Sequence, residues 1–220
     1  MFQLGLHQLD YDSVYYRSVC AQAATPLLNR AMNLDMNIRT TNVAEVIRGR
    51  RTINAFKPER VSKDLVLAAI DLARWAPNHY LTEPWNFYLL SEGAKKKVVE
   101  LNAELVAAAK DVEAAEAKRA RWSAIPGWMV VTCDRSTDAL RSREDYEACC
   151  CAIHSFSLYL WSQGVGVKWT TGDVIRDPRF YEIIWADPEE EEVVGLVWYG
   201  YPAEIPVTVR KPVSEIVVEI

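Results

Sequence analysis

Residues 145–172, DYEACCCAIHSFSLYLWSQGVGVKWTTG, are the stretch from which the fold of this chain is best inferred. Asp145–Gln163 is apolar or small-sided over about five helical turns, which predicts a long buried helix that ends at Gly164. Small side chains such as Ala152 would let a second helix approach it closely. Val165–Thr170 then predicts a strand that leads into a hydroxyl and a glycine.

Similar patterns recur on both sides of this stretch. Three further apolar runs predict strands, at Trp85–Leu90, Trp128–Cys133 and Val193–Tyr199. Capping signals predict that helices begin at Asn42, Ser62 and Asp177. The alternation of helices and apolar strands indicates a mixed sheet covered by helices on both faces. The last residues, Ile216–Ile220, predict a short strand with no local partner.

Three segments carry more detailed predictions. The helix that Ser62 caps has an apolar face with a period near 3.6, formed by Leu65, Leu67, Ala68, Leu72 and Trp75. Gly93–Arg121 is rich in Ala, Glu and Lys and has few large apolar residues, which predicts an exposed helical arm or mobile lid. The acidic run Glu189–Glu192 predicts a solvated loop.

Residues 1–40 differ in composition from the rest, so we expect an N-terminal extension followed by one domain over 41–220. Two interpretations of the extension stay open. It is a helical arm, with a helix over 12–32 that Pro26 interrupts, or it is a translation-start artefact and the natural start is Met36.

Composition excludes several classes of function. The 220 residues include 25 Lys and Arg against 30 Asp and Glu, so the net charge of −5 argues against nucleic-acid binding. No apolar run approaches the ~18 residues of a membrane span, and the start does not resemble a signal peptide. The five cysteines, including the run Cys149–Cys151, and the three histidines lack disulfide or metal-ligand spacing. We therefore expect reduced thiols in a cytoplasmic protein without a metal site.

Four motifs could carry chemistry. Arg48–Thr52 places three guanidiniums and a hydroxyl within five residues, a set that can bind phosphate through forked hydrogen bonds. Ala76–Trp85 is a proline-bracketed polar loop, Gly166–Gly172 ends a strand, and Gly200–Glu204 precedes the basic pair of Arg210–Pro212. Each also has an ordinary structural explanation, as helix-end cations, turns or a strand end.

The order and spacing of these motifs resemble the FMN-dependent nitroreductase family, from about Asn42 to the C-terminus. The resemblance implies an α+β fold built as an intertwined homodimer, with FMN at the subunit interface. It also implies that the helix over Asp145–Gln163 lies in that interface and that Ile216–Ile220 adds a strand to the partner's sheet.

The resemblance assigns cofactor binding to Arg50, Arg51, Thr52, Asn78, His79, Trp169, Thr170, Thr171 and Arg210. By position, the first three contact the phosphate and the ring edge of FMN, and Arg210 reaches the phosphate with Lys211 beside it. The stretch 169–171 lies along the flavin. No catalytic residue is implied, because the cofactor carries the chemistry.

The middle motif departs from the commoner family pattern. Leu81 and Glu83 stand where many members have Asn and Gln, whereas Asn78-His79 resembles a branch with Ala-Pro-Asp-His, whose histidine lies on the flavin. Asn54 occupies a position that is often basic, near the pyrimidine edge of the flavin.

The activity implied is an FMN-dependent oxidoreductase that takes hydride from NADH or NADPH. By a ping-pong mechanism it would reduce small nitroaromatic, quinone or similar electrophilic acceptors. The stretch 94–121 corresponds to the family's variable region over the pocket. Two alternatives stay open: the same fold with dehalogenase or flavin-fragmenting chemistry, or a flavin-binding protein without turnover.

Overall fold

The computed structural model describes residues 42–220. The expectations for the helix over 12–32 and for Met36 therefore lie outside the described residues. Within them, no helix is long and apolar enough to cross a membrane.

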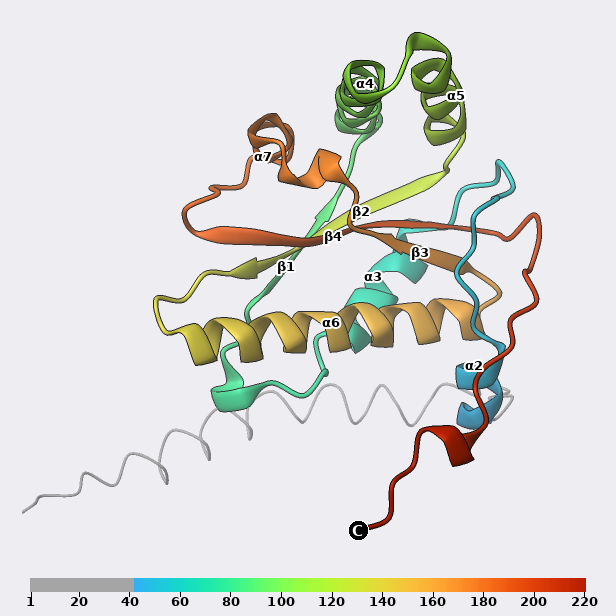
Figure 1. Ribbon diagram of the computed structural model, residues 1–220, viewed down its shortest axis with the longest axis vertical. Helices are drawn as coiled ribbons and strands as arrows, with labels where there is room; N and C mark the ends of the chain where they lie inside the picture. Colours follow the sequence, from blue (N-terminus) through green and yellow to red (C-terminus); the bar gives the residue numbers. More distant parts are fainter. Residues whose placement is uncertain (1–41) are drawn as a thin grey trace, which may run out of the picture. The chain divides into compact units, whose positions relative to one another are not determined.

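The centre of the described chain is one four-stranded sheet (Figure 1). Its strands are β1 (Trp85–Leu89), β2 (Gly127–Asp134), β3 (Gly166–Thr170) and β4 (Glu191–Gly200), in the order β1-β2-β4-β3. All three pairings are antiparallel, so the α+β class is confirmed, while the parallel part of the expected mixed sheet reduces here to one bridge, Thr52 with Val167. The chain after Thr52 does not continue as a strand beside β3, and Phe56 forms its bridge with Pro202 instead.

Helices cover both faces of the sheet (Figure 1). One face carries α3 and α6, with α2 near the end of α6, and the other carries α4, α5 and α7. Their bounds are α2 (Val43–Gly49), α3 (Lys63–Ala73), α4 (Glu92–Ala109), α5 (Val112–Ser123), α6 (Ala139–Ser162) and α7 (Pro178–Ile184). Short 3₁₀ turns are η1 (His79–Leu81), η2 (Asp173–Arg176) and η3 (Val213–Glu215). The expected long helix is therefore confirmed and begins six residues earlier, at Ala139.

Local capping signals are confirmed. The side chains of Asn42 and Ser62 accept hydrogen bonds from backbone N–H groups of the helices that follow them, at 3.0 and 3.3 Å. Asp177 caps α7, whose first residue is Pro178. After α6, Gly164 has φ of +75°, a conformation that glycine adopts without steric cost.

The predicted apolar face of α3 is wrong in part, because Leu65 packs against the core but Leu67 is exposed. Its buried residues are Val66, Ala69 and Ala73, which pack in the core against α6, whereas Leu72 and Trp75 are exposed. Two alanines on the inner face bring α3 close to α6, and the buried face is turned away from the predicted one toward Val66.

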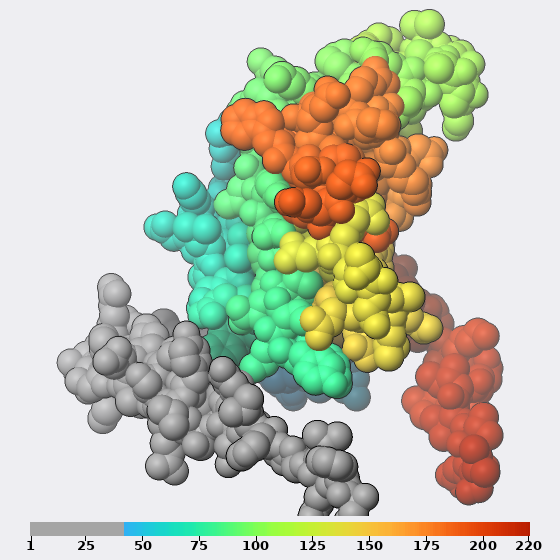
Figure 2. Space-filling model, turned by 90° about the vertical axis from the view of Figure 1, so that its left-hand side faces the viewer, coloured from blue at the N-terminus to red at the C-terminus, as the bar shows by residue number. Residues whose placement is uncertain are grey.

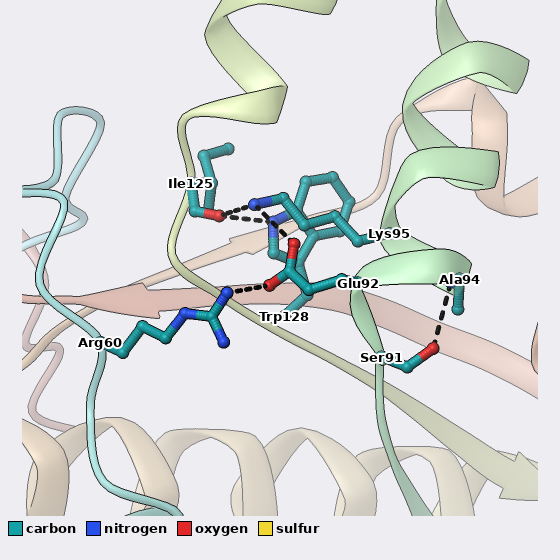
Figure 3. A network of polar contacts seen from close by, with 7 residues as sticks. All are labelled: Arg60, Ser91, Glu92, Ala94, Lys95, Ile125 and Trp128. Carbon is teal, nitrogen blue, oxygen red and sulfur yellow. Dashed lines mark hydrogen bonds and ion pairs between the residues drawn. The ribbon is translucent and has the colours of Figure 1, made fainter.

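The expectation of a mostly exposed lid over 93–121 is also wrong in part. The stretch forms two packed helices, α4 and α5, separated where Asp111 caps the second one. Figure 3 shows how α4 is held: the buried Lys95 donates to the carbonyl of Ile125 at 2.5 Å, and Arg60 pairs with Glu92 at 2.9 Å. Burial lowers the pKa of Lys95.

The tryptophans of three elements pack the inner side of these helices. Trp122 of α5 lies 5.0 Å from Trp198 of β4 and 5.7 Å from Trp128 of β2, between ring centroids. Edge-on pairs of this kind add stabilisation beyond the area they bury. The last turn of α5, which we call its base, therefore packs on the sheet.

The expected solvated acidic loop is confirmed for Glu189 and Glu190, which lie in an exposed turn. It is wrong for Glu191, which begins β4 and whose carboxylate accepts hydrogen bonds from Tyr88 and Thr132. Burial, and then the neighbouring carboxylate, raise the pKa of Tyr88 to about 12. The C-terminal strand is not formed in a single chain either: beyond η3, Ile216–Ile220 has no regular structure and is exposed. Figure 2 shows this C-terminal segment projecting from the body of the described chain.

Candidate functional site

Three arginines gather where α2 ends. Arg50 follows the last residue of α2 in an extended conformation, and Arg51 turns back so that its Nη1 donates to the carbonyls of Arg48 and Arg50, at 2.6 and 2.9 Å. Burial is the largest cause that lowers the pKa of Arg50, followed by the charges of Arg210 and Arg51. Arg210, 160 residues further along the chain, therefore lies within electrostatic reach of Arg50.

No carboxylate neutralises this cluster in the described part of the chain. The ion pairs between residues 42 and 220 include none of Arg50, Arg51 and Arg210. Like charges brought together without a partner disfavour the fold, and a bound anion would remove that cost. The arrangement fits a phosphate group, which guanidiniums bind through paired charge-assisted hydrogen bonds.

Thr52 brings this cluster to the open edge of β3. It bridges to Val167, and the next N–H, that of Ile53, donates to the Val167 carbonyl at 3.1 Å. Backbone groups of alternate residues point to the same side of a strand, so the N–H and C=O of Trp169 face the same edge. This edge offers a planar ligand both donors and acceptors beyond the arginines.

The side chain of Trp169 has a structural role. Its Nε1 donates to the Val194 carbonyl at 3.2 Å, and the indole lies so close to Gly195 that a Cβ there would stand 2.0 Å from Nε1. Only glycine fits beneath the ring. The sequence signal for this contact is the single glycine within the apolar run of β4.

The two threonines that follow differ in their surroundings. Thr170 ends β3 opposite Leu196, whereas Thr171 lines a cavity of about 520 Å³ together with Tyr146 and Glu192.

Lys168 was not identified from the sequence, and it changes the meaning of Asn54. Its Nζ donates to Asn54 Oδ1 at 2.7 Å and lies 5.2 Å from the centroid of Trp198. Position 54 lacks a basic side chain of its own, but β3 supplies one beside it. The sequence feature that could have identified Lys168 is its place as the single charged residue within the apolar stretch Gly166–Trp169.

The loop that carries Asn78 and His79 is held by its own hydrogen bonds. Asn78 accepts from the N–H of Glu83 at 2.6 Å and donates to Thr82 Oγ1 at 2.7 Å, and Thr82 donates to the buried Asp145 at 2.5 Å. His79 is exposed, with its ring centroid 4.1 Å from that of Tyr80. The amide of Asn78 is therefore committed to the loop, and the imidazole is the group left to meet a ligand.

Backbone strain concentrates in the same loop. Tyr80, Leu81 and Glu83 have φ of 57°, 53° and 47°, in the left-handed region that non-glycine residues rarely adopt. Such conformations persist only where surrounding contacts over-determine them, and they cluster at binding sites.

Two sets of the predicted site residues, the Asn78–His79 loop and the arginines after α2, lie at opposite ends of α6, whereas Trp169–Thr171 belong to β3 and the turn after it. Figure 1 shows α2 near one end of α6. The His79 loop is tied to Asp145 near the start of the helix, whereas a Cβ at Gly49, just before Arg50, would stand 3.1 Å from the Trp161 ring near its end. Sixteen residues of helix separate Asp145 from Trp161, which corresponds to about 24 Å. One chain therefore does not bring His79 to the arginines.

Of the three cysteines of α6, Cys149 and Cys150 pack in the core, whereas Cys151 is exposed. Cys149 is buried, and its thiol donates to the Thr132 carbonyl at 3.8 Å. A hydrogen bond with Cys133, and then burial, raise the pKa of Cys149, while burial raises the pKa of Cys150 to about 11. Both stay protonated near neutral pH and are poor nucleophiles. Among residues 42–220, no group of three or more side chains is placed to hold a metal ion.

Comparison with known proteins adds independent evidence. The sequence model of the nitroreductase family matches residues 47–201. A protein of Bacillus subtilis (strain 168) named as the NAD(P)H nitroreductase YfhC is 28% identical over 177 residues, which cover 78% of this chain and 90% of that protein.

Two solved structures show the same fold. A nitroreductase-like family protein from Bacillus cereus is 32% identical, covers 82% of this chain and 96% of its own, and superposes with a TM-score of 0.72. A structure from Desulfovibrio desulfuricans, described as a nitroreductase in complex with FMN, is 19% identical, covers 81% and 96%, and has a TM-score of 0.65.

Proposed function

Because the chain belongs to the nitroreductase family, we propose that it transfers hydride from NADH or NADPH, through FMN, to nitroaromatic, quinone or similar electrophilic acceptors by a ping-pong mechanism. The observation that carries the proposal is the cluster of Arg50, Arg51 and Arg210, which forms no ion pair with a carboxylate between residues 42 and 220. FMN supplies the hydride chemistry when it is bound, and the protein supplies binding and orientation.

The residues of this chain divide that work along the edge of β3. Arg50 and Arg210 hold the phosphate, with Arg51 and the hydroxyl of Thr52 beside them. The backbone of Trp169, with Thr170 and Thr171 beyond it, lies along the ring. Lys168, bonded to Asn54, places a positive charge at the pyrimidine edge.

The second group of residues enters from another chain in this proposal. A homodimer would bring the His79 loop of one subunit to the arginines of its partner, which the spacing along α6 denies to a single chain. Large exposed apolar side chains support an extensive interface, because isolated chains rarely expose so many. They lie on α2 and along the C-terminal segment, at Val43, Ile47, Ile205, Val207, Val209, Val213, Ile216, Val217, Val218 and Ile220.

We place the C-terminal segment of each subunit at β1 of its partner. β1 is an edge strand, so its outer backbone groups have no strand beside them in the described chain. A largely apolar cavity of about 600 Å³ runs beside this edge, lined by Phe87, Leu89, Ile183 and Trp185, among others. The apolar residues Ile216–Val218 match such a surface.

The test is the visible absorption spectrum of the purified protein, followed by anaerobic addition of NADPH and then NADH. We expect a bound flavin spectrum that bleaches with at least one donor and recovers with a quinone. Bound FMN that neither donor bleaches would favour the dehalogenase or flavin-fragmenting alternative. A colourless protein that FMN does not reconstitute would contradict the proposal.

A further inference from the structure

A second group of cations lies at the base of α5. Lys118, Arg121 and Trp122 are spaced i, i+3 and i+4, so they share one face of the helix. Trp122 packs on Trp198, with 5.0 Å between ring centroids, and Lys168 Nζ lies 5.2 Å from the same Trp198 ring. The two cations of α5 therefore flank the side chain that brings the helix to Lys168.

These three cations have no acidic partner within residues 42–220. The ion pairs of α5 use Arg119 instead, which pairs with Glu100 and Glu116. After burial, the charges of Arg121 and Lys118 are the causes that lower the pKa of Lys168, which agrees with their closeness. Within the described residues, α5 thus neutralises Arg119, which pairs with α4, and leaves the two cations beside Lys168 without an ion pair.

The position of the cluster relates it to the flavin site. Lys168 bonds to Asn54, two residues after Thr52, and belongs to the strand whose open edge forms the proposed cofactor site. The cluster is separate from Arg50 and Arg210, which stand at the end of α2. A molecule bound against the flavin could reach it.

We propose that Lys118, Arg121 and Lys168 bind a phosphate or carboxylate group of the substrate that approaches the flavin. The inference rests on the proposed function and adds a preference for anionic substrates. A guanidinium supplies a planar pair of donors, and two ammonium groups add charge in a partly buried setting, where hydrogen bonds to charged groups are strong. The anion belongs either to the nicotinamide dinucleotide or to the acceptor.

The experiment compares two charge-matched double variants of the FMN-loaded protein. Lys118→Gln with Arg121→Gln removes the cluster's charges on α5, whereas Lys96→Gln with Lys97→Gln removes two exposed charges from α4. For each we would measure kcat/KM for NADPH and NADH with a neutral quinone. With NADH, we would also compare a carboxylated nitroarene with its uncharged amide.

We expect the Lys118/Arg121 variant to lower kcat/KM about tenfold for the substrate that carries the anion, the size of one lost charge-assisted hydrogen bond. If the ratio of kcat/KM for NADPH to that for NADH falls, the bound anion is the 2′-phosphate of NADPH. If kcat/KM falls equally for both donors, the bound anion is their pyrophosphate. If the ratio of kcat/KM for the carboxylated nitroarene to that for its amide falls, the bound anion is the carboxylate of the acceptor. Values equal to those of the Lys96/Lys97 variant in all three comparisons would overturn the proposal.

A binding measurement separates this proposal from the proposed function. Calorimetric titration of the FMN-loaded protein with inorganic pyrophosphate needs no turnover. We expect binding that weakens about tenfold in the Lys118/Arg121 variant and is unchanged in the Lys96/Lys97 variant. Bound pyrophosphate in a protein without turnover would leave the anion site standing and the proposed activity refuted. The same affinity in both variants would refute the anion site.

Discussion

The two ends of α6 differ in how their polar side chains are paired. Near its last turn, Arg50, Arg51 and Arg210 gather positive charge with no carboxylate beside them among residues 42–220. Near its first turns, Asp145 and the loop around His79 satisfy one another through short hydrogen bonds. The first end leaves its positive charge without an ion pair among residues 42–220, while the second satisfies its polar groups but is strained, with three non-glycine residues at positive φ.

This difference indicates that the two ends have different roles. A charge cluster of this kind binds a ligand strongly, whereas a rigid loop presents a group, here His79, in a defined place. About 24 Å of helix keeps the two functions apart within one chain. In the homodimer that we propose, a flavin site that uses both ends would take one end from each subunit.

The largest effect is expected from the arginine end. Arg50→Ala with Arg210→Ala removes two charge-assisted contacts to the phosphate, so FMN affinity should fall about a hundredfold or more. Titration of apoprotein with FMN, followed by flavin fluorescence, measures it. A control with Arg143→Ala and Lys96→Ala loses two exposed cations elsewhere and should bind FMN normally. Full flavin occupancy in the first variant would show that the phosphate lies elsewhere.

The assignment of the two ends to different subunits can be tested by mixing chains. A dimer of an Arg50→Ala, Arg210→Ala chain with a His79→Ala chain carries both defects in one site and none in the other. We expect one flavin per dimer with native affinity, although neither parent homodimer has such a site. If the mixed dimer binds no FMN with native affinity, the arginines and His79 of one chain belong to the same site.

The loop end should show itself mainly in stability. Asp145→Ala leaves the hydroxyl of Thr82 without its partner and frees the strained loop, so we expect a loss of about 1–3 kcal/mol in the free energy of unfolding. Glu147→Ala, on the same helix, breaks only an exposed ion pair with Arg143 and should cost less than about 1 kcal/mol. Urea denaturation of both variants measures the difference, and equal losses would contradict a role for Asp145 in holding the loop.

The smallest effect concerns the edge of β3 between the two ends. Lys168→Met removes the positive charge beside Asn54 without shortening the side chain much. Because that charge favours added electrons on a flavin next to it, the reduction potential should fall by about 20–60 mV, where 30 mV corresponds to about 1.4 kcal/mol. Lys97→Met on α4 is the control. An unchanged potential in Lys168→Met would place the pyrimidine edge away from this lysine.

Much of the fold could be predicted because its signals are local. The capping side chains of Asn42, Ser62 and Asp177 act within one turn, and the glycine at 164 acts through its own backbone. The failures involve packing partners. The buried face of α3 depends on how closely α6 approaches, and the cap at Asp111, which separates α4 from α5, was a local signal that the composition of the whole stretch concealed.

The sequence by itself indicated the four strands of the sheet and the helix caps at Asn42, Ser62 and Asp177, because these follow from side-chain type and short-range spacing. The tertiary structure alone decided which residues meet. It set Lys168 beside Asn54 and brought Arg210 to Arg50. It also separated His79 from these arginines by the length of α6. Spacing along a chain does not encode distance in space, and a rigid helix can keep two neighbouring motifs apart as readily as a sheet can join distant ones.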